Sequence, residues 1–301
     1  MTTAFVLSGG GNLGAMQAGS VAALMEAGIE PEIFVGASVG ALNAAFLACR
    51  PGLDGAQALR AAWERLRREE AIQLSPMHAV LGFLGLRDCL ISARRLRRLI
   101  QRWIPVQRLE ETTRPVAAVA TDALSGEAVI LERGPILDVL AASAAIPGLF
   151  PPVKIDGGWL IDGSLSANHP VLQAQDLGAH EIYLIATTTA ARLAPPRGAV
   201  AIAMNSVSLM SAQASRVHVA EAQRRAREMG GRLHLVPTGE PPAPGPFDYG
   251  QSAVLAESSY RRTQRWLDEG LPASTGPDPI DSDAGPPKSQ AVEREGGPVV
   301  S

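Results

Sequence analysis

The chain has 301 residues, with 27 lysines and arginines against 30 aspartates and glutamates, and 46% of its residues are apolar. These values are typical of a globular protein with one or two domains. A formal net charge of −3 excludes a whole-molecule attraction to nucleic-acid phosphates, so we expect no nucleic-acid partner.

Apolar runs rich in β-branched residues alternate with alanine-rich helical patterns, which predicts βαβ units, a mostly parallel sheet and an α/β fold. We predict strands at residues 4–7, 33–35, 116–121, 128–131 and 181–187, and helices at residues 14–27, 39–49 and 252–267. Residues 237–250 contain five prolines and are predicted to form a loop inside the domain. Residues 271–301 carry six prolines and no aromatic residue. We therefore expect a folded domain at 1–270 and a disordered tail at 271–301.

The cysteine content and the amino terminus predict where the protein resides. Cys49 and Cys89 are too few for a disulfide framework or a four-cysteine zinc site, which favours a reducing compartment. The amino terminus turns glycine-rich too soon for a secretory signal. A long uncharged stretch lies between Arg197 and Arg216, and its polar residues suit a buried helix better than a membrane span. We expect a soluble, cytoplasmic protein with at most peripheral membrane contact.

A Gly-x-Ser-x-Gly pattern joins the predicted strand at 33–35 to the helix that follows it. Gly36 and Gly40 flank Ser38, and glycines at these positions allow a sharp turn that exposes the serine hydroxyl at a helix N-terminus. This context favours a nucleophilic serine. The alternative is a small residue in a strand-to-helix loop or helix cap.

A second glycine-rich turn, Gly9-Gly10-Gly11-Asn12-Leu13-Gly14, follows the first predicted strand. It fits the dinucleotide-binding pattern, with Glu30 or Glu32 near the distance of a ribose-binding acid. It equally fits an oxyanion hole built from backbone N–H groups. Because one βαβ unit brings both turns to the same sheet edge, we expect the glycine-rich turn to lie beside Ser38, which favours acyl transfer.

A serine nucleophile requires a base. The histidines, which are His78, His169, His180, His218 and His234, stand in no distinctive setting, although His169 is the best candidate among them. We expect His180 just before a strand and His218 and His234 on or near a polar helix. Asp162 ends an apolar run and precedes a glycine, and Asp156 is its rival a few residues earlier.

Taken together, these residues resemble the patatin-like phospholipase family, over about residues 3–270. Gly9 to Gly14 is similar to the family's oxyanion loop and Gly36 to Gly40 to its nucleophile elbow. Residues 142–153 resemble the segment before its catalytic aspartate, and Asp162-Gly163-Ser164 with Asn168-His169-Pro170 resembles its Asp-Gly block and Asn-x-Pro. The chain has Leu13 where the family commonly has arginine or lysine, and Ser164 where it has glycine or alanine.

The resemblance implies a three-layer α/β/α fold and a Ser-Asp dyad, with Ser38 as nucleophile and Asp162, rather than Asp156, as its base. It implies an oxyanion hole in the loop of Gly9, Gly10, Gly11, Asn12 and Gly14, and an Asp-Gly turn at Gly163 and Ser164. The expected substrate is a lipid or another acyl ester, and no metal or cofactor is required. The resemblance leaves the oligomeric state open.

One predicted helix suggests a membrane contact. Residues 92–103 place five arginines around Leu96, Leu99, Ile100 and Trp103 with amphipathic spacing. A basic amphipathic helix can lie on an anionic membrane surface. The interpretation we favour is that the apolar stripe covers the core and the arginines are solvated.

Overall fold

The computed structural model describes residues 1–67, 92–187, 198–239 and 248–270. The predicted tail at 271–301, His78, Cys89 and the centre of the 237–250 loop lie outside these described residues. Cys49 is a free, half-buried thiol packed against the core, and burial raises its pKa.

The described strands form one eight-stranded sheet with the order β5-β6-β3-β2-β1-β7-β8, and β4 pairs with β3. Strands β3, β2, β1, β7 and β8 are parallel neighbours, whereas β4, β5 and β6 pair antiparallel. The bounds are β1 Thr3–Leu7, β2 Ile33–Ala37, β3 Val116–Asp122, β4 Ala128–Leu131, β5 Val153–Ile155, β6 Gly158–Asp162, β7 Glu181–Ile185 and β8 Arg232–Leu235.

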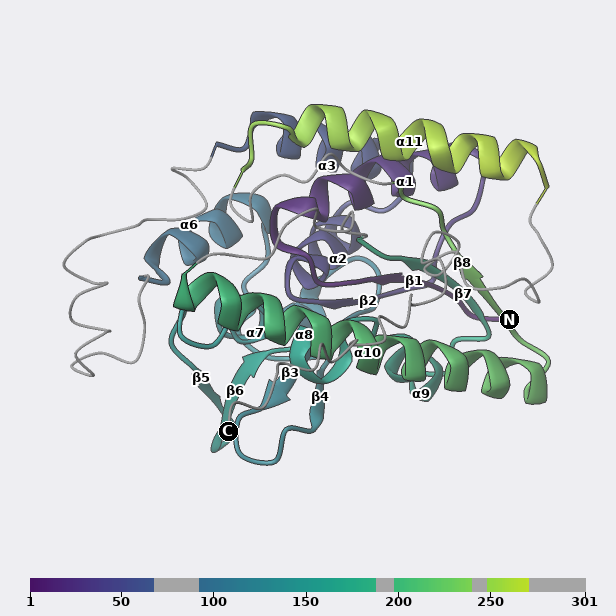
Figure 1. Ribbon diagram of the computed structural model, residues 1–301. Coiled ribbons are helices and arrows are strands. Elements are labelled where there is room, and N and C mark those ends of the chain that lie inside the picture. Colours follow the sequence, from purple (N-terminus) through teal and green to yellow (C-terminus); the bar gives the residue numbers. More distant parts are fainter. Residues whose placement is uncertain (68–91, 188–197, 240–247, 271–301) are drawn as a thin grey trace, which may run out of the picture.

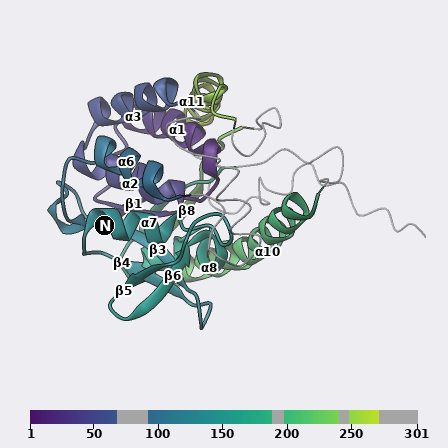
Figure 2. The same cartoon turned by 90° about the vertical axis from the view of Figure 1, so that its left-hand side faces the viewer.

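Helices cover both faces of this sheet, which makes the fold a three-layer α/β/α arrangement (Figure 1 and Figure 2). Helices α1, α3 and α11 lie on one side, and α8, α9 and α10 lie on the other. The bounds are α1 Gly14–Glu26, α2 Val39–Cys49, α3 Leu53–Arg65, α6 Arg94–Trp103, α7 Ile136–Ser143, α8 Ser164–Ala167, α9 Val171–Asp176, α10 Ala199–Glu228 and α11 Ser252–Asp268, with 3₁₀ turns at Gly11–Leu13 and Leu109–Glu111.

The central strands are apolar on both faces because both faces are buried. Phe5, Leu7 and Phe34 point into the larger core, with α1, α2, α3 and α11. Their neighbours Val6 and Val35 point into the smaller core, with α8, α9 and α10. The period of two along each strand therefore assigns alternate side chains to the two helical layers.

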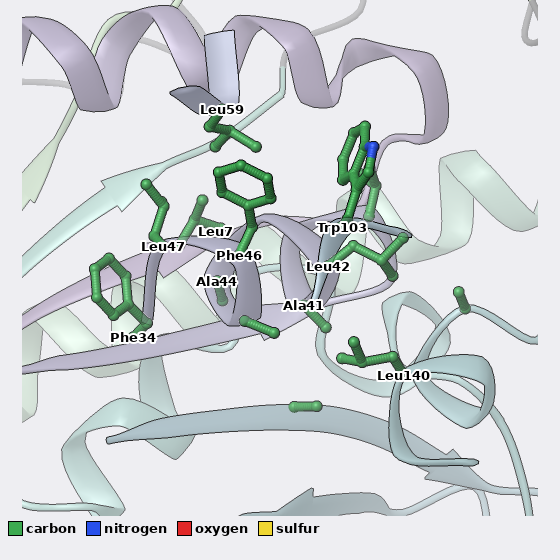
Figure 3. Packing of buried hydrophobic residues seen from close by; sticks show 14 of the residues in the cluster. Leu7, Phe34, Ala41, Leu42, Ala44, Phe46, Leu47, Leu59, Trp103 and Leu140 are labelled. Atoms are coloured by element: carbon green, nitrogen blue, oxygen red, sulfur yellow. The ribbon is translucent and has the colours of Figure 1, made fainter. Parts of the chain in front are cut away.

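Helix α2, which follows the Gly-x-Ser-x-Gly turn, is buried along its whole length from Val39 to Ala48. Figure 3 shows Phe46 and Leu47 on α2 beside Leu59 of α3 and Phe34 of β2. The rings of Phe46 and Trp103 meet edge to face with their centroids 5.8 Å apart. A helix held on all sides fixes the turn at its N-terminus, where Ser38 lies.

Most predicted elements are present, and two expectations about them are wrong. The helix in the uncharged stretch is α10, but Ile202, Leu209 and Met210 in that stretch are exposed, with Met210 73% accessible, so the expectation of a buried helix is wrong. It packs on the sheet through residues further along, such as Val219 and Ala222. His234 lies on strand β8 rather than on a helix. No helix in the described part of the chain is long and apolar enough to cross a membrane.

Helix α6 is amphipathic as predicted, and its apolar stripe faces inward. Leu96, Leu99, Ile100 and Trp103 are all buried in the core. Arg97 pairs with Asp138 at 2.9 Å, and Arg94 is exposed. The interpretation that this stripe covers the core is confirmed.

Candidate active site

The edge of strand β3 brings Ser38 and Asp162 together. Its first part, Val116 to Val119, pairs with β2, and Val119 is opposite Ala37. Its last part, Ala120 to Asp122, pairs with β6, and Ala120 is opposite Asp162. β4 pairs with residues 118–121 along one edge of β3, so β2 and β6 both lie along the opposite edge. They end beside consecutive residues of β3, Val119 and Ala120. Ser38, the residue after Ala37, therefore lies next to Asp162, the last residue of β6.

Ser38 and Asp162 are in direct contact. The Ser38 hydroxyl donates a hydrogen bond to Asp162 Oδ2 with an Oγ–Oδ2 distance of 2.7 Å. Both residues are buried, and no imidazole intervenes in this contact. Asp156, the sequence-level rival, lies in the β5–β6 turn with a φ of 48°.

The turn at Ser38 has the geometry of a nucleophile elbow. Ser38 adopts φ 54° and ψ −125°, a conformation that is rare for a residue with a side chain and that costs on the order of 1–3 kcal/mol. The flanking glycines allow this turn, because a β-carbon at Gly36 would lie 2.3 Å from the Gly40 carbonyl oxygen. A β-carbon at Gly40 would lie 2.2 Å from the Leu7 carbonyl oxygen. The glycines are therefore required by backbone contact.

Ser143 supports the elbow from α7. Its hydroxyl accepts a hydrogen bond from the Ser38 N–H at 3.0 Å and donates one to the Val119 carbonyl at 2.6 Å. The Ser143 carbonyl also accepts from the N–H of Gly163 at 3.1 Å. One residue thus contacts the backbone of both the serine turn and the Asp-Gly turn. The sequence pattern placed Ser143 in a family-like segment but gave no sign of this contact.

The second oxygen of Asp162 is held by Ser164. The Ser164 N–H and hydroxyl donate to Asp162 Oδ1 at 2.8 and 2.7 Å. Burial raises the pKa of the Asp162 carboxyl above its ordinary value, and the hydrogen bonds from Ser164 and Ser38 oppose this shift with smaller effects. The carboxylate is therefore oriented by one oxygen while the other faces Ser38, and its raised pKa makes it a better proton acceptor.

The glycine-rich loop lies against this pair, as the βαβ argument predicts. A β-carbon at Gly9 would lie 3.4 Å from the Ser38 β-carbon and 2.8 Å from that of Ser164. The Gly9 N–H donates to the Asn168 carbonyl at 3.2 Å, and that of Gly14 donates to Gly11. Gly10 and Gly11 have φ values of 156° and 58°, which direct the backbone out of the strand. In the described part of the chain, the N–H groups of Gly10 and Gly11 donate to no protein acceptor.

A buried polar network lies under the loop. The Gln17 amide donates to the carbonyls of Ser8 and Ile185 at 2.8 and 3.2 Å, at the ends of β1 and β7. Asn43 donates to Gln17 Oε1 at 2.9 Å and to the Gly14 carbonyl at 3.0 Å. The indole N–H of Trp63 donates to Asn43 Oδ1 at 2.9 Å. The network joins α1, α2 and α3 to the carboxyl edge of the sheet.

Two further contacts fix the loop's outer side. Thr187 donates its hydroxyl to the Gly9 carbonyl at 2.5 Å, and its N–H donates to the Ser8 hydroxyl at 2.8 Å. The Asn12 side chain donates to the Asp248 carbonyl at 2.8 Å, so it ties the loop to the segment before α11.

Glu32, one of the two acids considered for a ribose, lies at the other end of β1. Its carboxylate accepts from the N–H of Thr3, where that strand begins, whereas the glycine-rich loop follows Leu7, where the strand ends. A ribose-binding acid belongs at the carboxyl ends of the strands, beside the phosphate-binding loop. This placement speaks against a dinucleotide site that uses Glu32.

The described histidines show no contact with Ser38 or Asp162. His169 is buried, and its Nδ1 has no hydrogen-bond partner. Burial lowers the pKa of its imidazole to about 4, with a smaller contribution from the nearby His218. His180 precedes β7, and His234 bonds Glu181 on the first residue of that strand at 2.6 Å. Among the described residues, no group of three or more histidine, cysteine, aspartate or glutamate side chains is arranged to hold a metal ion.

Comparison with known proteins identifies the family. The model of the patatin-like phospholipase family matches residues 5–174, more than half of the chain. The chain therefore belongs to the patatin-like phospholipase family. Its matched region contains the Gly9–Gly14 loop, the Ser38 elbow and Asp162.

Curated relatives match over part of the chain. An uncharacterized NTE family protein of Mycobacterium tuberculosis is 32% identical over 167 residues, which are 55% of this chain and 27% of that protein. Patatin-like phospholipase domain-containing protein 6 of Mus musculus is 27% identical over 186 residues, 61% of this chain and 13% of that protein. The chain thus spans about a quarter or less of the length of these two relatives.

Solved structures to which this chain shows similarity include VipD from Legionella pneumophila, with a TM-score of 0.47, 17% identity, and coverage of 89% of this chain and 67% of that one. ExoU from Pseudomonas aeruginosa, solved in complex with SpcU, has a TM-score of 0.43 and 15% identity, and covers 91% of this chain and 53% of that one.

Proposed function

We propose that this protein is a lipid acyl hydrolase that cleaves a carboxylic ester through Ser38 and Asp162. The observation that carries the proposal is the 2.7 Å hydrogen bond from the Ser38 hydroxyl to Asp162 Oδ2. A nucleophile in contact with a base that a third group orients is the arrangement covalent catalysis requires. Ser164 orients Asp162 here. Membership of the patatin-like phospholipase family supports lipid esters as the substrate class.

In this mechanism, Asp162 accepts the Ser38 proton while the hydroxyl oxygen attacks the ester carbonyl. The resulting oxyanion is stabilised by the N–H groups of Gly10 and Gly11, and loss of one such donor typically costs about 100- to 1000-fold in rate. Protonated Asp162 then donates its proton to the departing alcohol, which leaves an acyl-serine. Asp162 next deprotonates a water molecule that attacks the acyl group, and the fatty acid is released as Ser38 regains its proton.

The raised pKa of Asp162 suits both halves of this cycle. A buried carboxylate binds a proton more readily than an exposed one, so proton transfer from Ser38 is easier. The same group must return that proton to the alcohol, and a moderately raised pKa favours general acid as well as general base catalysis. The proposal needs no imidazole, metal or cofactor.

The catalytic unit we propose is residues 1–270, acting as a cytoplasmic enzyme. Two other functions are weighed against it: a nucleotide-binding module that uses the Gly9–Gly14 loop, and a catalytically silent relative that acts through protein contacts. A nucleotide that raises the melting temperature by several degrees would favour the first. Absence of hydrolysis with every acyl ester tried would favour the second.

Labelling with a fluorophosphonate probe tests the proposal directly. Wild type should be labelled at Ser38, and Ser38→Ala should lose both labelling and hydrolysis of a short p-nitrophenyl ester. Ser258→Ala, which changes an exposed serine on α11, is the matched control and should keep both. Full esterase activity in Ser38→Ala would overturn the assignment. Lipids consumed by wild type but not by Ser38→Ala, measured by mass spectrometry, would identify the substrate.

A further inference from the structure

Helix α10 presents an unusual apolar surface. Five of the ten large apolar side chains that are exposed in the described part of the chain lie on this one segment. They are Ile202, Val207, Leu209, Met210 and Val217, with exposed fractions of 51, 45, 61, 73 and 67%. Surface clusters of this kind mark interaction sites.

Four of these residues share one face of the helix. The spacing along the helix is seven residues from Ile202 to Leu209 and seven from Met210 to Val217, and Leu209 and Met210 are adjacent. At 3.6 residues per turn, all four side chains fall within an arc of roughly 100°. Val219 and Ala222, which pack against the sheet, lie on the opposite side. We call the exposed set of Ile202, Leu209, Met210 and Val217 the α10 stripe.

The helix that carries the α10 stripe lies beside the candidate active site. The Ser211 hydroxyl donates to the Ser164 carbonyl at 2.5 Å, and Ser164 in turn donates to Asp162. Figure 2 shows the N-terminal turns of α10 projecting from the body, clear of the other labelled elements. One chain of hydrogen bonds therefore connects the face of α10 opposite the stripe to the proposed base.

Three residues of the stripe, Ile202, Leu209 and Met210, lie in a segment without charge, whereas Val217 lies between Arg216 and His218. Residues 198–215 contain no lysine, arginine, aspartate, glutamate or histidine. A surface that bound anionic headgroups would need basic residues, and the rim of a protein interface is normally polar and charged. An uncharged segment with Ile202, Leu209 and Met210 exposed is suited to the boundary between headgroups and acyl chains.

We propose that the α10 stripe docks this protein on an uncharged lipid surface, next to the site that would hydrolyse the lipid. The inference rests on the proposed function, because a lipid substrate makes a bilayer the partner that must be reached. Docking by this stripe would place Ser38 near the membrane and shorten the path of an ester into the site. The arginines of α6 are not needed for it, since the stripe carries no charge.

Vesicle flotation tests the proposal, with neutral phosphatidylcholine vesicles and protein in a Ser38→Ala background so that no lipid is consumed. The Ser38→Ala protein should float, and Leu209→Asp/Met210→Asp in that background should reduce the bound fraction at least tenfold, because two charges would enter the apolar boundary. Val254→Asp, at a 60% exposed position on α11, is the matched control and should float unchanged. Binding should persist in 0.5 M NaCl, because screening weakens only charge interactions.

Three results would overturn the proposal: no flotation by the parent protein, equal flotation by the double variant, or loss of binding in 0.5 M NaCl. A dimer in sedimentation that the double variant dissociates would instead assign the stripe to a second copy. With Ser38 intact, the double variant should hydrolyse a soluble short ester within twofold of wild type, which shows that it is folded. If the proposed function is wrong, Ser38→Ala will keep its esterase activity. Flotation is measured without any hydrolysis, so the two tests can fail independently.

Discussion

The hydroxyl of Ser143 accepts a hydrogen bond from the backbone N–H of Ser38 at 3.0 Å. This N–H belongs to a residue in a strained conformation, and a buried N–H without a partner costs about 1–3 kcal/mol. The same hydroxyl donates to Val119, so the proposed nucleophile is tied through Ser143 to the strand that also pairs with β6. Ser143 is therefore a positioning residue for the elbow.

Ser143→Ala is expected to lower the free energy of unfolding by about 1–3 kcal/mol, because it leaves the Ser38 N–H and the Val119 carbonyl without their partner. Hydrolysis of a soluble ester should slow as well, mainly through kcat, since the hydroxyl of Ser38 loses its fixed direction. Urea unfolding and steady-state kinetics measure the two effects. Ser258→Ala, at an exposed site, is the control for both. An unchanged stability and kcat in Ser143→Ala would show that the contact has no such role.

Much of the site could be predicted from short sequence patterns, because the glycines around Ser38 and before α1 are required by local backbone geometry. Gly36 and Gly40 have no room for a side chain, and Gly10 and Gly11 have positive φ. The partner of Ser38 was harder to predict. Without the family resemblance, Asp156 and Asp162 look alike, since both precede a glycine at a turn. The pairing of β2 and β6 with one edge of β3 separates them, and pairing between distant strands leaves no local signal.

The exposure of α10 shows a second limit of the sequence. An uncharged stretch that includes Ile202, Leu209 and Met210 predicts burial, because apolar residues are usually inside. Whether such a helix is covered depends on where its neighbours end, which the composition of the helix does not report. The buried contacts of α10 come from residues such as Val219, beyond the uncharged stretch. The role of Ser143 was missed for a similar reason, because a serine at a helix end has many possible uses.

The pH dependence of the reaction should follow Asp162. The mechanism needs its carboxylate form, so kcat/KM for a soluble ester should rise with pH through a pKa that lies above the ordinary aspartate value. Asp162→Asn should abolish this limb together with most of the activity, whereas Asp156→Asn, the matched control, should leave the profile unchanged. An acid limb at the ordinary aspartate pKa would contradict the environment that burial creates.

The same shift predicts an effect on stability. A carboxyl whose folded-state pKa is raised binds its proton more tightly when folded, so its stabilising contribution is present below the unfolded pKa and is lost as pH rises through the folded pKa. The free energy of unfolding of Asp162→Asn minus that of wild type should therefore be larger at pH 7 than at pH 4. Urea unfolding at both pH values measures this difference. If this difference in unfolding free energy is the same at both pH values, the Asp162 carboxyl does not titrate between pH 4 and pH 7.

Gly9→Ala is expected to lower kcat by about 100-fold, the loss typical when an oxyanion donor is displaced. Its β-carbon would lie 2.6 Å from Asn168 Oδ1 and 2.8 Å from the Ser164 β-carbon, so the loop or the aspartate turn must move. Gly28→Ala is the matched control. Gly28 has a φ of 77° and open space around its β-carbon position, so this change should cost about 1 kcal/mol of stability and leave kcat intact. Equal kinetics in the two variants would show that the Gly9 contacts do not matter for turnover.

A serine hydrolase that uses an imidazole would need one beside its serine, and His169 is the best histidine candidate in the sequence. Its Nδ1 is buried without a partner, and burial, with a smaller effect of nearby His218, lowers its pKa to about 4. His169→Leu should therefore keep kcat at pH 8 within about threefold, because a neutral imidazole outside the Ser38–Asp162 contact has no proton to transfer. A loss as large as that of Ser38→Ala would overturn the dyad mechanism in favour of a triad.

The same histidine should weaken the fold in acid. A histidine whose folded-state pKa is lowered binds fewer protons when folded than when unfolded, so stability falls as pH drops from the unfolded pKa near 6.5 toward about 4. Between pH 7.5 and pH 5, this residue accounts for a loss of about 2 kcal/mol. His169→Leu should remove that part of the loss in urea unfolding at the two pH values. His180→Leu, which removes the half-buried histidine before β7, is the control and should leave the loss in place.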